Sequence, residues 1–383
     1  MFKFLQDEKH RAQFFQFSTL FLLVSLFAYL FHNTQANLER QNIATGFGFL
    51  EFEAGFDIGE SMIEYWSDDS YLKAIGVGVL NTLKVAVIGN FFAVLLGVII
   101  GLSHLSSNWL LRKVSRFYIE TIRNIPLLLQ LFFWYALFTE NLPGVKEAIE
   151  FLPNVFLSNR GLYLPIPKDT TTFLYSIIAF FVSLVAFVFL ERTRVQKEIK
   201  EGKSYSQFEK LNYLTFLLPV FIWLVMGAPR EIDFPALTGF NFSGGYHLSP
   251  EFSALVLGLV IYTSAFNAEI TRAGISSIDK GQWEAANSLG LGQGDTLKIV
   301  ILPQALRVMI PPLTSQILNL TKNSSLAVAI GYPDFVSITN TTMNQTGQAI
   351  ECVFIIMIIY LCLSVSTSLV MNSIASKFKI VER

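Results

Sequence analysis

Eight separate stretches of this sequence are long and apolar enough to cross a lipid bilayer as an α-helix, which needs roughly 20 mostly apolar residues. With 52% hydrophobic and only 15% charged residues, the chain also carries more apolar surface than a soluble domain can bury. We therefore expect an all-α integral membrane protein with about eight transmembrane helices. The stretches are 14–31, 74–102, 124–139, 171–190, 211–228, 251–270, 309–330 and 350–371.

The remaining composition excludes several classes of function. A net charge of −1 offers no large basic surface, so we expect no nucleic acid partner. In one helix, Cys352 and Cys362 would lie about 15 Å apart, which is too far for a disulfide. The four histidines are dispersed without the spacing of a metal site. The first apolar stretch has no small-residue cleavage site, so we expect a retained span rather than a signal peptide.

Lys and Arg are distributed unequally between the predicted loops, and this asymmetry predicts the orientation. With the N-terminus in the cytoplasm, 20 basic residues lie on the inner side. Because basic residues accumulate on the cytoplasmic side of membrane proteins, we expect both termini inside. Only six basic residues would lie outside, namely Arg40, Lys73, Lys146, Arg160, Lys168 and Arg230.

The spacing of the apolar stretches divides the chain into four parts. The first part contains the external loop 32–73, which is acidic and is expected to be a solvated segment. Four prolines within 141–170 predict an irregular external loop there. The four parts are 1–73, 74–140, 141–249 and 250–383.

The predicted inner loop 271–308 is longer than a simple connection needs, and it is patterned. Residues Gly281–Leu289 suit a short helix. Gly290 follows where a left-handed turn at the end of a helix is expected. The apolar residues near one stripe of this helix are Trp283, Ala286 and Leu289.

A second short helix is expected after the glycines that follow. Asp295 or Thr296 can cap it, and it should end at Leu302, before Pro303. The two helices would then lie beneath the membrane, joined by a sharp turn. The alternative is an amphipathic helix adsorbed on lipid headgroups, but adsorption requires no glycine at one fixed offset.

Six residues of this loop carry a specific resemblance. At the family's spacing they match the EAA loop of importer permeases in the ATP-binding-cassette (ABC) superfamily, and they are Glu284, Ala285, Ala286, Gly290, Leu302 and Pro303. In that family the loop is a coupling helix, which sits in a cleft of a separate ATPase subunit. The resemblance implies that Glu284 makes a polar contact to the ATPase, that Gly290 permits the bend, and that Gly281 belongs to the same contact.

The resemblance extends over about 75–140 and 250–375, where the chain is similar to the polar amino acid permease family of histidine, glutamine and glutamate importers. This resemblance implies a type I importer permease core, to which the chain adds an N-terminal span and an insertion, 141–249, with two spans. Such an enlarged permease resembles the general or acidic L-amino acid subgroup, which works as a pair of unlike permeases. The matching motifs lie in Asn81–Lys84, Tyr118–Tyr135, Tyr262–Gly274 and Lys322–Leu326.

Polar side chains within the predicted spans are candidates for the substrate path, because a charge in hydrocarbon is costly and usually faces protein or water. An amino acid presents an ammonium and a carboxylate, so its site needs acceptors and donors for both. Hydrogen bonding between helices explains any single Asn or Ser equally well. The candidates are Asn81, Lys84, Gln316, Asn319, Lys322, Asn323 and Ser324.

The sequence Glu201–Ser204 ends like a phosphate-binding loop, but Lys197 occupies the place of the required earlier glycine. We therefore expect no nucleotide site and no cofactor on this chain, with ATP and Mg bound by a partner. The resemblance implies a cassette ATPase dimer, a second homologous permease, a periplasmic amino-acid-binding protein and an L-amino acid substrate, in the bacterial inner membrane. Two alternatives stay open: a secondary transporter driven by an ion gradient, with Glu269 or Glu351 as the proton-coupling carboxylate, and a membrane scaffold without transport.

Overall fold

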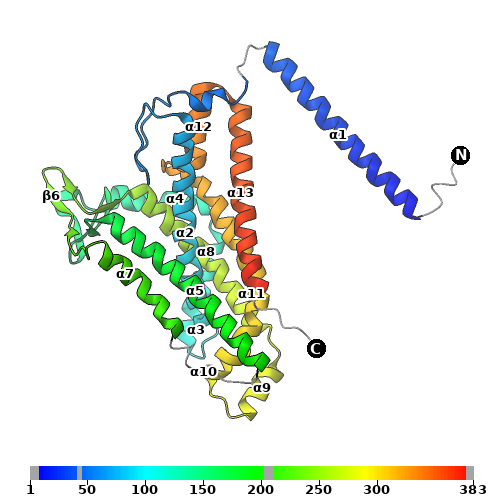
Figure 1. Cartoon of the computed structure of the whole chain (residues 1–383), viewed down its shortest axis with the longest axis vertical. Helices are drawn as coiled ribbons and strands as arrows, with labels where there is room; N and C mark the ends of the chain where they lie inside the picture. The colour runs from blue at the N-terminus through cyan, green and yellow to red at the C-terminus, as the bar shows by residue number, and fades with distance from the viewer. Residues whose placement is uncertain (1–7, 41–44, 202–210, 377–383) are drawn as a thin grey trace. The chain divides into compact units, whose positions relative to one another are not determined.

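The computed structural model describes residues 8–40, 45–201 and 211–376 (Figure 1). Most of the phosphate-loop-like sequence Glu201–Ser204 lies outside the described residues. The same holds for some of the basic residues expected inside, namely Lys3, Lys203, Lys210, Lys377, Lys379 and Arg383. The chain forms two compact units. The first comprises residues 1–130 and 255–383, and the second comprises 131–254, which includes all of the expected insertion.

Helices make up most of both units. Those of the first unit, including two that cross its boundary (α4 and α8), are α1 (Glu8–Arg40), α2 (Tyr71–His104), α3 (Trp109–Asn124), α4 (Leu127–Ala136), α8 (Pro250–Ser276), α9 (Lys280–Ser288), α10 (Gln293–Asp295), α11 (Leu302–Asn323), α12 (Phe335–Thr346) and α13 (Ala349–Ser376). A π-helical stretch, Thr296–Ile301, joins α10 to α11, and 3-10 helices occupy Gly48–Glu51 and Ser324–Ile330.

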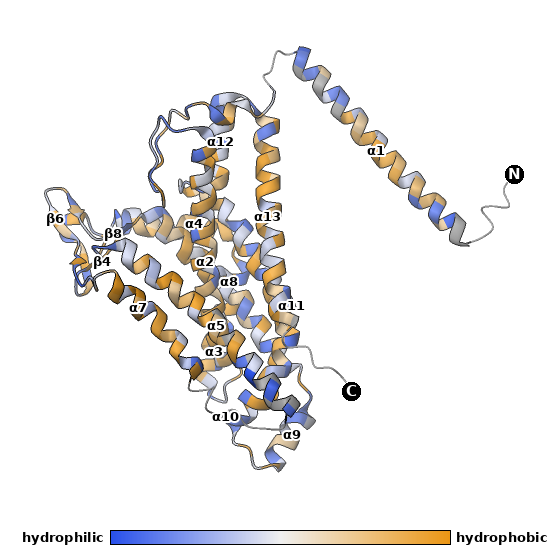
Figure 2. Cartoon of the chain, in the orientation of Figure 1, coloured by the Kyte–Doolittle hydropathy of each residue, from blue (hydrophilic) through white to orange (hydrophobic). Residues whose placement is uncertain are grey.

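Six helices in the described part of the chain are long and apolar enough to span a bilayer, and a bent pair makes a seventh if it counts as one span. The helical membrane fold is therefore confirmed, with fewer full-length spans than the eight expected. Residues 211–228 contain only the shorter helix Tyr213–Val225, and 124–139 lies across α3 and α4, which meet at an angle of 103°. Figure 2 shows apolar residues along most of α2 and α13.

The bend between α3 and α4 has a local cause. Pro126 disfavours helical geometry at the residue before it, and Ile125 accordingly takes extended angles (φ −100°, ψ 127°) and ends α3. The side-chain amide of Gln130 donates hydrogen bonds to the carbonyls of Ile122 and Ile125, each at 2.9 Å. These bonds satisfy carbonyls that the break leaves without helical partners.

Two glycines of α2 allow it to pack closely against α8. A Cβ atom at Gly97 would lie 2.4 Å from Cβ of Asn267, and one at Gly101 would lie 2.6 Å from the carbonyl oxygen of Ala268. Residues four apart share one helix face, and small residues at this spacing let membrane helices approach closely. The contact brings the C-terminal end of α2, with His104, alongside α8.

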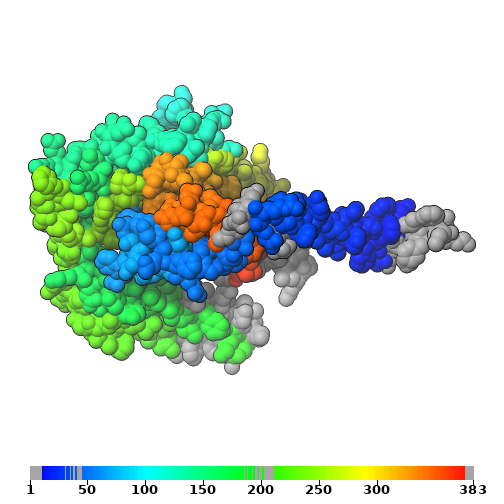
Figure 3. Space-filling view, turned by 90° about the horizontal axis from the view of Figure 1, so that it is seen from above, coloured from blue at the N-terminus to red at the C-terminus, as the bar shows by residue number. Residues whose placement is uncertain are grey.

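Residues 45–70 are mostly exposed, as their acidic character predicts, but they also follow a defined path over the first unit. They fold against the N-terminal part of α2 and the region of α12, beside which they lie in Figure 3. The 3-10 helix Gly48–Glu51 buries Phe49 in a cluster with Tyr71 and Cys352. Most acidic residues of the segment are exposed, while aromatic side chains between them pack into an apolar cluster that the charge count does not reveal.

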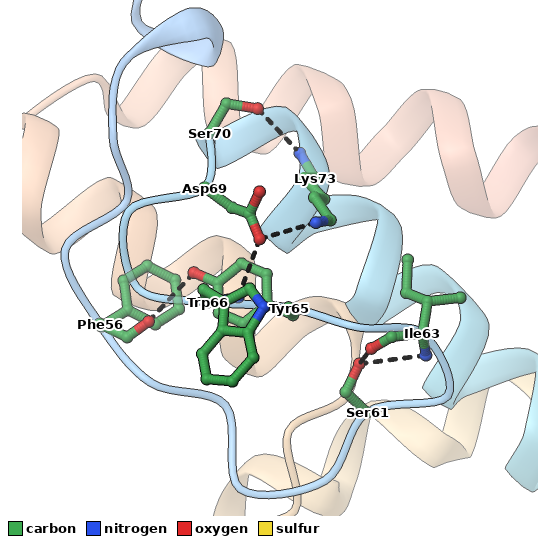
Figure 4. Close-up of polar contacts among 8 residues, drawn as sticks. All are labelled: Phe56, Ser61, Ile63, Tyr65, Trp66, Asp69, Ser70 and Lys73. Atoms are coloured by element: carbon green, nitrogen blue, oxygen red, sulfur yellow. Dashed lines mark hydrogen bonds and ion pairs between the residues drawn. The ribbon is translucent and has the colours of Figure 1, made fainter.

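Hydrogen bonds within this segment stabilise its path (Figure 4). The hydroxyl of Tyr65 donates to the carbonyl of Phe56 at 3.0 Å. The carboxylate of Asp69 accepts from the backbone N–H of Trp66 at 2.8 Å and pairs with the ammonium of Lys73 at 2.7 Å. These two interactions lower the pKa of Asp69. The segment is thus a folded strap that precedes α2.

The second unit combines short antiparallel strands with a helical hairpin. The sheets have the orders β1-β2-β3-β8, β4-β5 and β6-β7. Their strands are β1 (Ile149–Leu152), β2 (Val155–Ser158), β3 (Gly161–Leu164), β4 (Ile166–Pro167), β5 (Ile232–Asp233), β6 (Ala236–Thr238), β7 (Asn241–Ser243) and β8 (Tyr246–Leu248). The helical elements are α5 (Thr170–Glu201), α7 (Leu218–Val225), a π-helical stretch at Leu137–Asn141 and 3-10 helices at Val145–Glu147 and Tyr213–Leu217.

The irregular loop expected over 141–170 is therefore corrected, because it contains four of these strands. Two of its four prolines fall at strand connections. Pro153 precedes Asn154, which takes a left-handed conformation (φ 61°) in the turn between β1 and β2, and Pro165 separates β3 from β4. Prolines thus mark turns between strands here, which a proline count alone does not distinguish from an unstructured loop.

Candidate functional site

The corner segment, residues 279–302, begins with α9. The carboxylate of Asp279 caps this helix by accepting a hydrogen bond from the backbone N–H of Gly281 at 2.6 Å. Gly290 ends it with a left-handed conformation (φ 75°), as the sequence predicts. The N–H of Gly290 bonds to the carbonyl of Asn287 at 2.9 Å, and the N–H of the next residue bonds to the carbonyl of Ala286 at 3.2 Å. This pair of bonds is the Schellman motif, which reverses the chain sharply.

The second helix of the corner segment differs from the expectation. It begins at Gln293 after Gly292 as N-cap, rather than at Asp295 or Thr296, and it continues through the π-helical stretch into α11. The expected end before Pro303 is wrong. A proline is tolerated there because the π-helical stretch just before it already departs from regular helical hydrogen bonding.

One face of the corner segment packs on its own unit, and the other face is exposed. Ala286 is buried, and Trp283 packs on a cluster that contains Ile275 and Ile301. Leu289, expected on the same stripe, is 81% exposed because it lies beyond the last helical turn as the C-cap. Leu302 is half-buried, and the exposed residues of the resemblance are Gly281, Glu284, Ala285, Gly290 and Pro303.

A charged cavity of about 340 Å³ lies between α2, α3 and α8. Arg116 pairs with Glu120 at 2.7 Å, and Arg272 pairs with Glu269 at 2.5 Å. Sequence reasoning missed this cavity as a site, because its residues come from three helices that are distant in the chain. The available signal was the three- and four-residue spacing of the two Arg–Glu pairs. The lining residues are His104, Arg116, Ile119, Glu120, Arg123, Glu269 and Arg272.

Asn81 and Lys84, two candidates for the substrate path, are bound by the strap of residues 45–70. The ammonium of Lys84 lies 2.5 Å from the carboxylate of Glu60, and these side chains are only 7% and 13% exposed. The amide of Asn81 donates to the backbone carbonyls of Glu60 at 2.8 Å and Pro333 at 2.9 Å. Both candidates therefore meet at Glu60, a residue that the sequence did not single out.

Four of the other five candidates lie in the C-terminal half of α11, and Ser324 comes directly after it. Gln316, Asn319 and Lys322 recur every three residues and therefore lie near one helix face. Asn319 and Lys322 are exposed, while Gln316 and Asn323 are half-buried. Ser324 is buried, and its hydroxyl donates to a backbone carbonyl of the preceding turn at 2.7 Å.

Comparison with known proteins adds a second line of observation. The family described as binding-protein-dependent transport system inner membrane component matches residues 200–380. The general L-amino acid transport system permease protein AapQ of Rhizobium johnstonii is 45% identical over 379 residues, which cover 99% of this chain and 95% of AapQ. This chain belongs to the permease family.

Two further relatives cover the permease almost completely. YhdX of Escherichia coli strain K12, named only provisionally as an amino-acid ABC transporter permease, is 49% identical over 374 residues, or 97% of this chain and 95% of YhdX. The glutamate/glutamine/aspartate/asparagine transport system permease protein BztB of Rhodobacter capsulatus is 36% identical over 412 residues. These residues cover 99% of this chain and 96% of BztB. The N-terminal helix and the second unit thus have counterparts in these relatives.

Membership of this family confirms the identification drawn from the EAA-like residues. The chain is a membrane-spanning permease component of an ABC transporter rather than a catalytic enzyme. The corner segment lies inside the stretch that matches the family.

Proposed function

We propose that this permease works in an ABC importer that carries polar or acidic L-amino acids into the cytoplasm. The observation that carries the proposal is the exposed corner formed by α9, Gly290 and the start of α10. Ala286 anchors this corner while Glu284 and Ala285 stay exposed, so an ATPase subunit finds a firm polar contact there. The substrates that the names of AapQ and BztB state support the substrate class.

The corner is mechanically continuous with the substrate path that we propose. One unbroken helix runs from Gln293 to Asn323, and its far end carries Gln316, Asn319 and Lys322. Displacement of α9 acts on this helix through the apolar cluster beneath Trp283. Closure of the ATPase would therefore move polar side chains of the path, which is the basis of alternating access.

The proposal includes three protein partners. A cassette ATPase dimer binds ATP and Mg, so this chain needs no nucleotide site or cofactor of its own. A second, unlike permease covers the exposed face with Asn319 and Lys322, since a charge on a membrane helix is costly unless it faces protein or water. A periplasmic amino-acid-binding protein delivers the substrate. The family description as an inner membrane component supports the bacterial inner membrane as the location. The distribution of basic residues supports an orientation with both termini in the cytoplasm.

Uptake of radiolabelled L-glutamate into proteoliposomes tests this function. The permease is reconstituted with the subunits that co-purify with it in mild detergent and with the binding protein. We expect uptake to require ATP on the ATPase side and to persist when ionophores collapse the ion gradients. Uptake that follows an ion gradient without ATP would instead support the secondary transporter, with Glu269 or Glu351 as the coupling carboxylate.

Replacement of Lys322 by Leu tests the substrate path. We expect a loss of uptake of at least tenfold, because one charged partner for the substrate disappears. The matched control is Lys113→Leu, which removes an exposed lysine of α3 and should leave uptake unchanged. Normal uptake by Lys322→Leu would remove this lysine from the path, and absence of any transport by the wild-type complex would favour the scaffold.

A further inference from the structure

The cavity between α2, α3 and α8 has the size and the lining of a site for a small charged molecule. Its volume of about 340 Å³ lies at the lower end of the range of roughly 300–1,000 Å³ for ligand pockets. Ile119 supplies an apolar wall, and six charged or titratable side chains supply the remainder. The cavity involves none of the candidates for the substrate path or the corner segment.

Arg123 is the cationic group of this cavity that remains available. Arg116 and Arg272 are each paired with a glutamate. The guanidinium of Arg123 lies 5.1 Å from the ring centre of Phe266, and no carboxylate pairs with it within residues 8–40, 45–201 and 211–376. A guanidinium stacked on an aromatic ring keeps its planar fork of N–H donors free for a carboxylate.

Glu269 provides the complementary charge beside Arg123. It extends from α8 and lines the same cavity as Arg123. Arg272 donates to both carboxylate oxygens of Glu269, at 2.5 Å and 3.1 Å. Each of these oxygens keeps a second lone pair that can accept a further donor. A cation receptor and an anion receptor therefore lie side by side in one cavity.

We propose that this cavity binds the zwitterionic head of an amino acid, with its α-carboxylate on Arg123 and its ammonium on Glu269. The inference rests on the proposed function and deepens it by assigning a substrate-binding station on α3 and α8. In this arrangement the cavity recognises the α-carboxylate and the ammonium, which all α-amino acids share. Such recognition suits a permease with a broad substrate range. The side chain of the substrate would extend past Ile119.

An anionic lipid headgroup is the competing occupant, since its phosphate also binds guanidinium groups. Two carboxylates line the cavity, Glu120 and Glu269, and both would repel a phosphate. A zwitterion uses both signs of charge, so the lining favours an amino acid. Binding measurements on variants of Arg123 distinguish an amino acid from a lipid in this cavity.

Equilibrium dialysis with radiolabelled L-glutamate and glutarate tests the assignment. The sample is the full-length permease with its co-purifying subunits, without the periplasmic binding protein, which would itself bind the probe. Glutarate has the carboxylates but no ammonium. We expect Arg123→Gln to weaken binding of both probes at least tenfold, and Glu269→Gln to weaken binding of L-glutamate while glutarate binding is kept or improved.

Controls distinguish recognition from a structural effect. Arg112→Gln removes an exposed arginine of the same helix that does not line the cavity, and it should bind both probes like the wild type. Arg123→Lys keeps the charge without the planar fork and should restore part of the binding. Equal loss of both probes in Glu269→Gln would indicate a merely structural role and would overturn the assignment.

The remaining outcomes separate this inference from the proposed function. If Arg123→Gln binds and transports L-glutamate like the wild type while ATP-driven uptake is normal, the cavity assignment fails and the function stands. If Arg123→Gln loses co-purifying phosphatidylglycerol and keeps both probes, the cavity binds lipid and the assignment again fails. If the wild-type complex shows no ATP-driven uptake at all, the proposed function fails.

Discussion

The carboxylate of Glu60 lies 2.5 Å from the ammonium of Lys84, and both side chains are almost completely buried. Glu60 belongs to the strap of residues 45–70, whereas Lys84 lies well inside the long helix α2. Taking a charge out of water is costly, so each of these two groups depends on the other. The strap therefore supplies a buried carboxylate to a lysine of the membrane helix.

Replacement of Lys84 by Met should destabilise the permease by about 3–5 kcal/mol, because it removes the ammonium that pairs with the buried carboxylate of Glu60. The free energy of unfolding in detergent measures this effect. The exposed pair of Lys168 with Glu231 is the matched control, since its side chains are 70% and 77% exposed. Lys168→Met should cost far less, since an exposed ion pair contributes little, and equal costs at both sites would contradict the role of burial.

Replacement of Gly290 by Val should detach or uncouple the ATPase while the permease still inserts into the membrane. The left-handed conformation at Gly290 costs a side chain roughly 1–2 kcal/mol, and no atom lies within 4 Å of the new Cβ. Co-purification of the ATPase and uptake measure the outcome. Gly294→Val also enters open space, but at a helical position, and should retain the ATPase. Normal coupling in the Gly290 variant would refute the importance of the turn.

Replacement of Gly97 by Val should separate α2 from α8 and cost about 1–3 kcal/mol of stability, because a Cβ there would lie 2.4 Å from Cβ of Asn267. Gly76→Val on the same helix meets nothing within 4 Å and serves as the control. Thermal unfolding in detergent should show a lower midpoint for the Gly97 variant alone. A similar decrease in both variants would point to a general intolerance of α2.

Asp334 should make stability depend on pH between about 4 and 6. Its carboxylate is fully buried at the start of α12, where it accepts a hydrogen bond from the backbone N–H of Ser337 at 2.8 Å. Burial raises its pKa to about 6, above the value of about 3.9 for an unfolded chain. The folded state then binds more protons in this range, so stability falls as the pH rises from about 4 to 6 and is constant above.

The size of this pH effect follows from the two pKa values and is about 2–3 kcal/mol. Chemical unfolding of the permease at a series of pH values measures it. Asp334→Asn keeps a side chain that can cap α12 and should abolish the slope. A slope that persists in this variant would assign the pH dependence to another group.

Most of the local structure could be predicted from the sequence. Long apolar runs become helices because a backbone in lipid must satisfy its own hydrogen bonds. Gly290 ends α9 in a left-handed turn because no other residue adopts this conformation as readily. Prediction failed where neighbouring elements decide the local structure. At Pro303 the helix continues because a π-helical stretch precedes the proline. In 141–170, pairing between strands replaces the expected irregular loop.

The sequence by itself determined the membrane class, the family and the corner at Gly290, because each depends on hydrophobicity, spacing or conformation within a short stretch of chain. Only the tertiary structure decided that Glu60 reaches Lys84 and that residues of α2, α3 and α8 share one cavity. Those relations depend on which helix faces pack together, as at Gly97 and Asn267, and such packing joins residues that are distant in the chain.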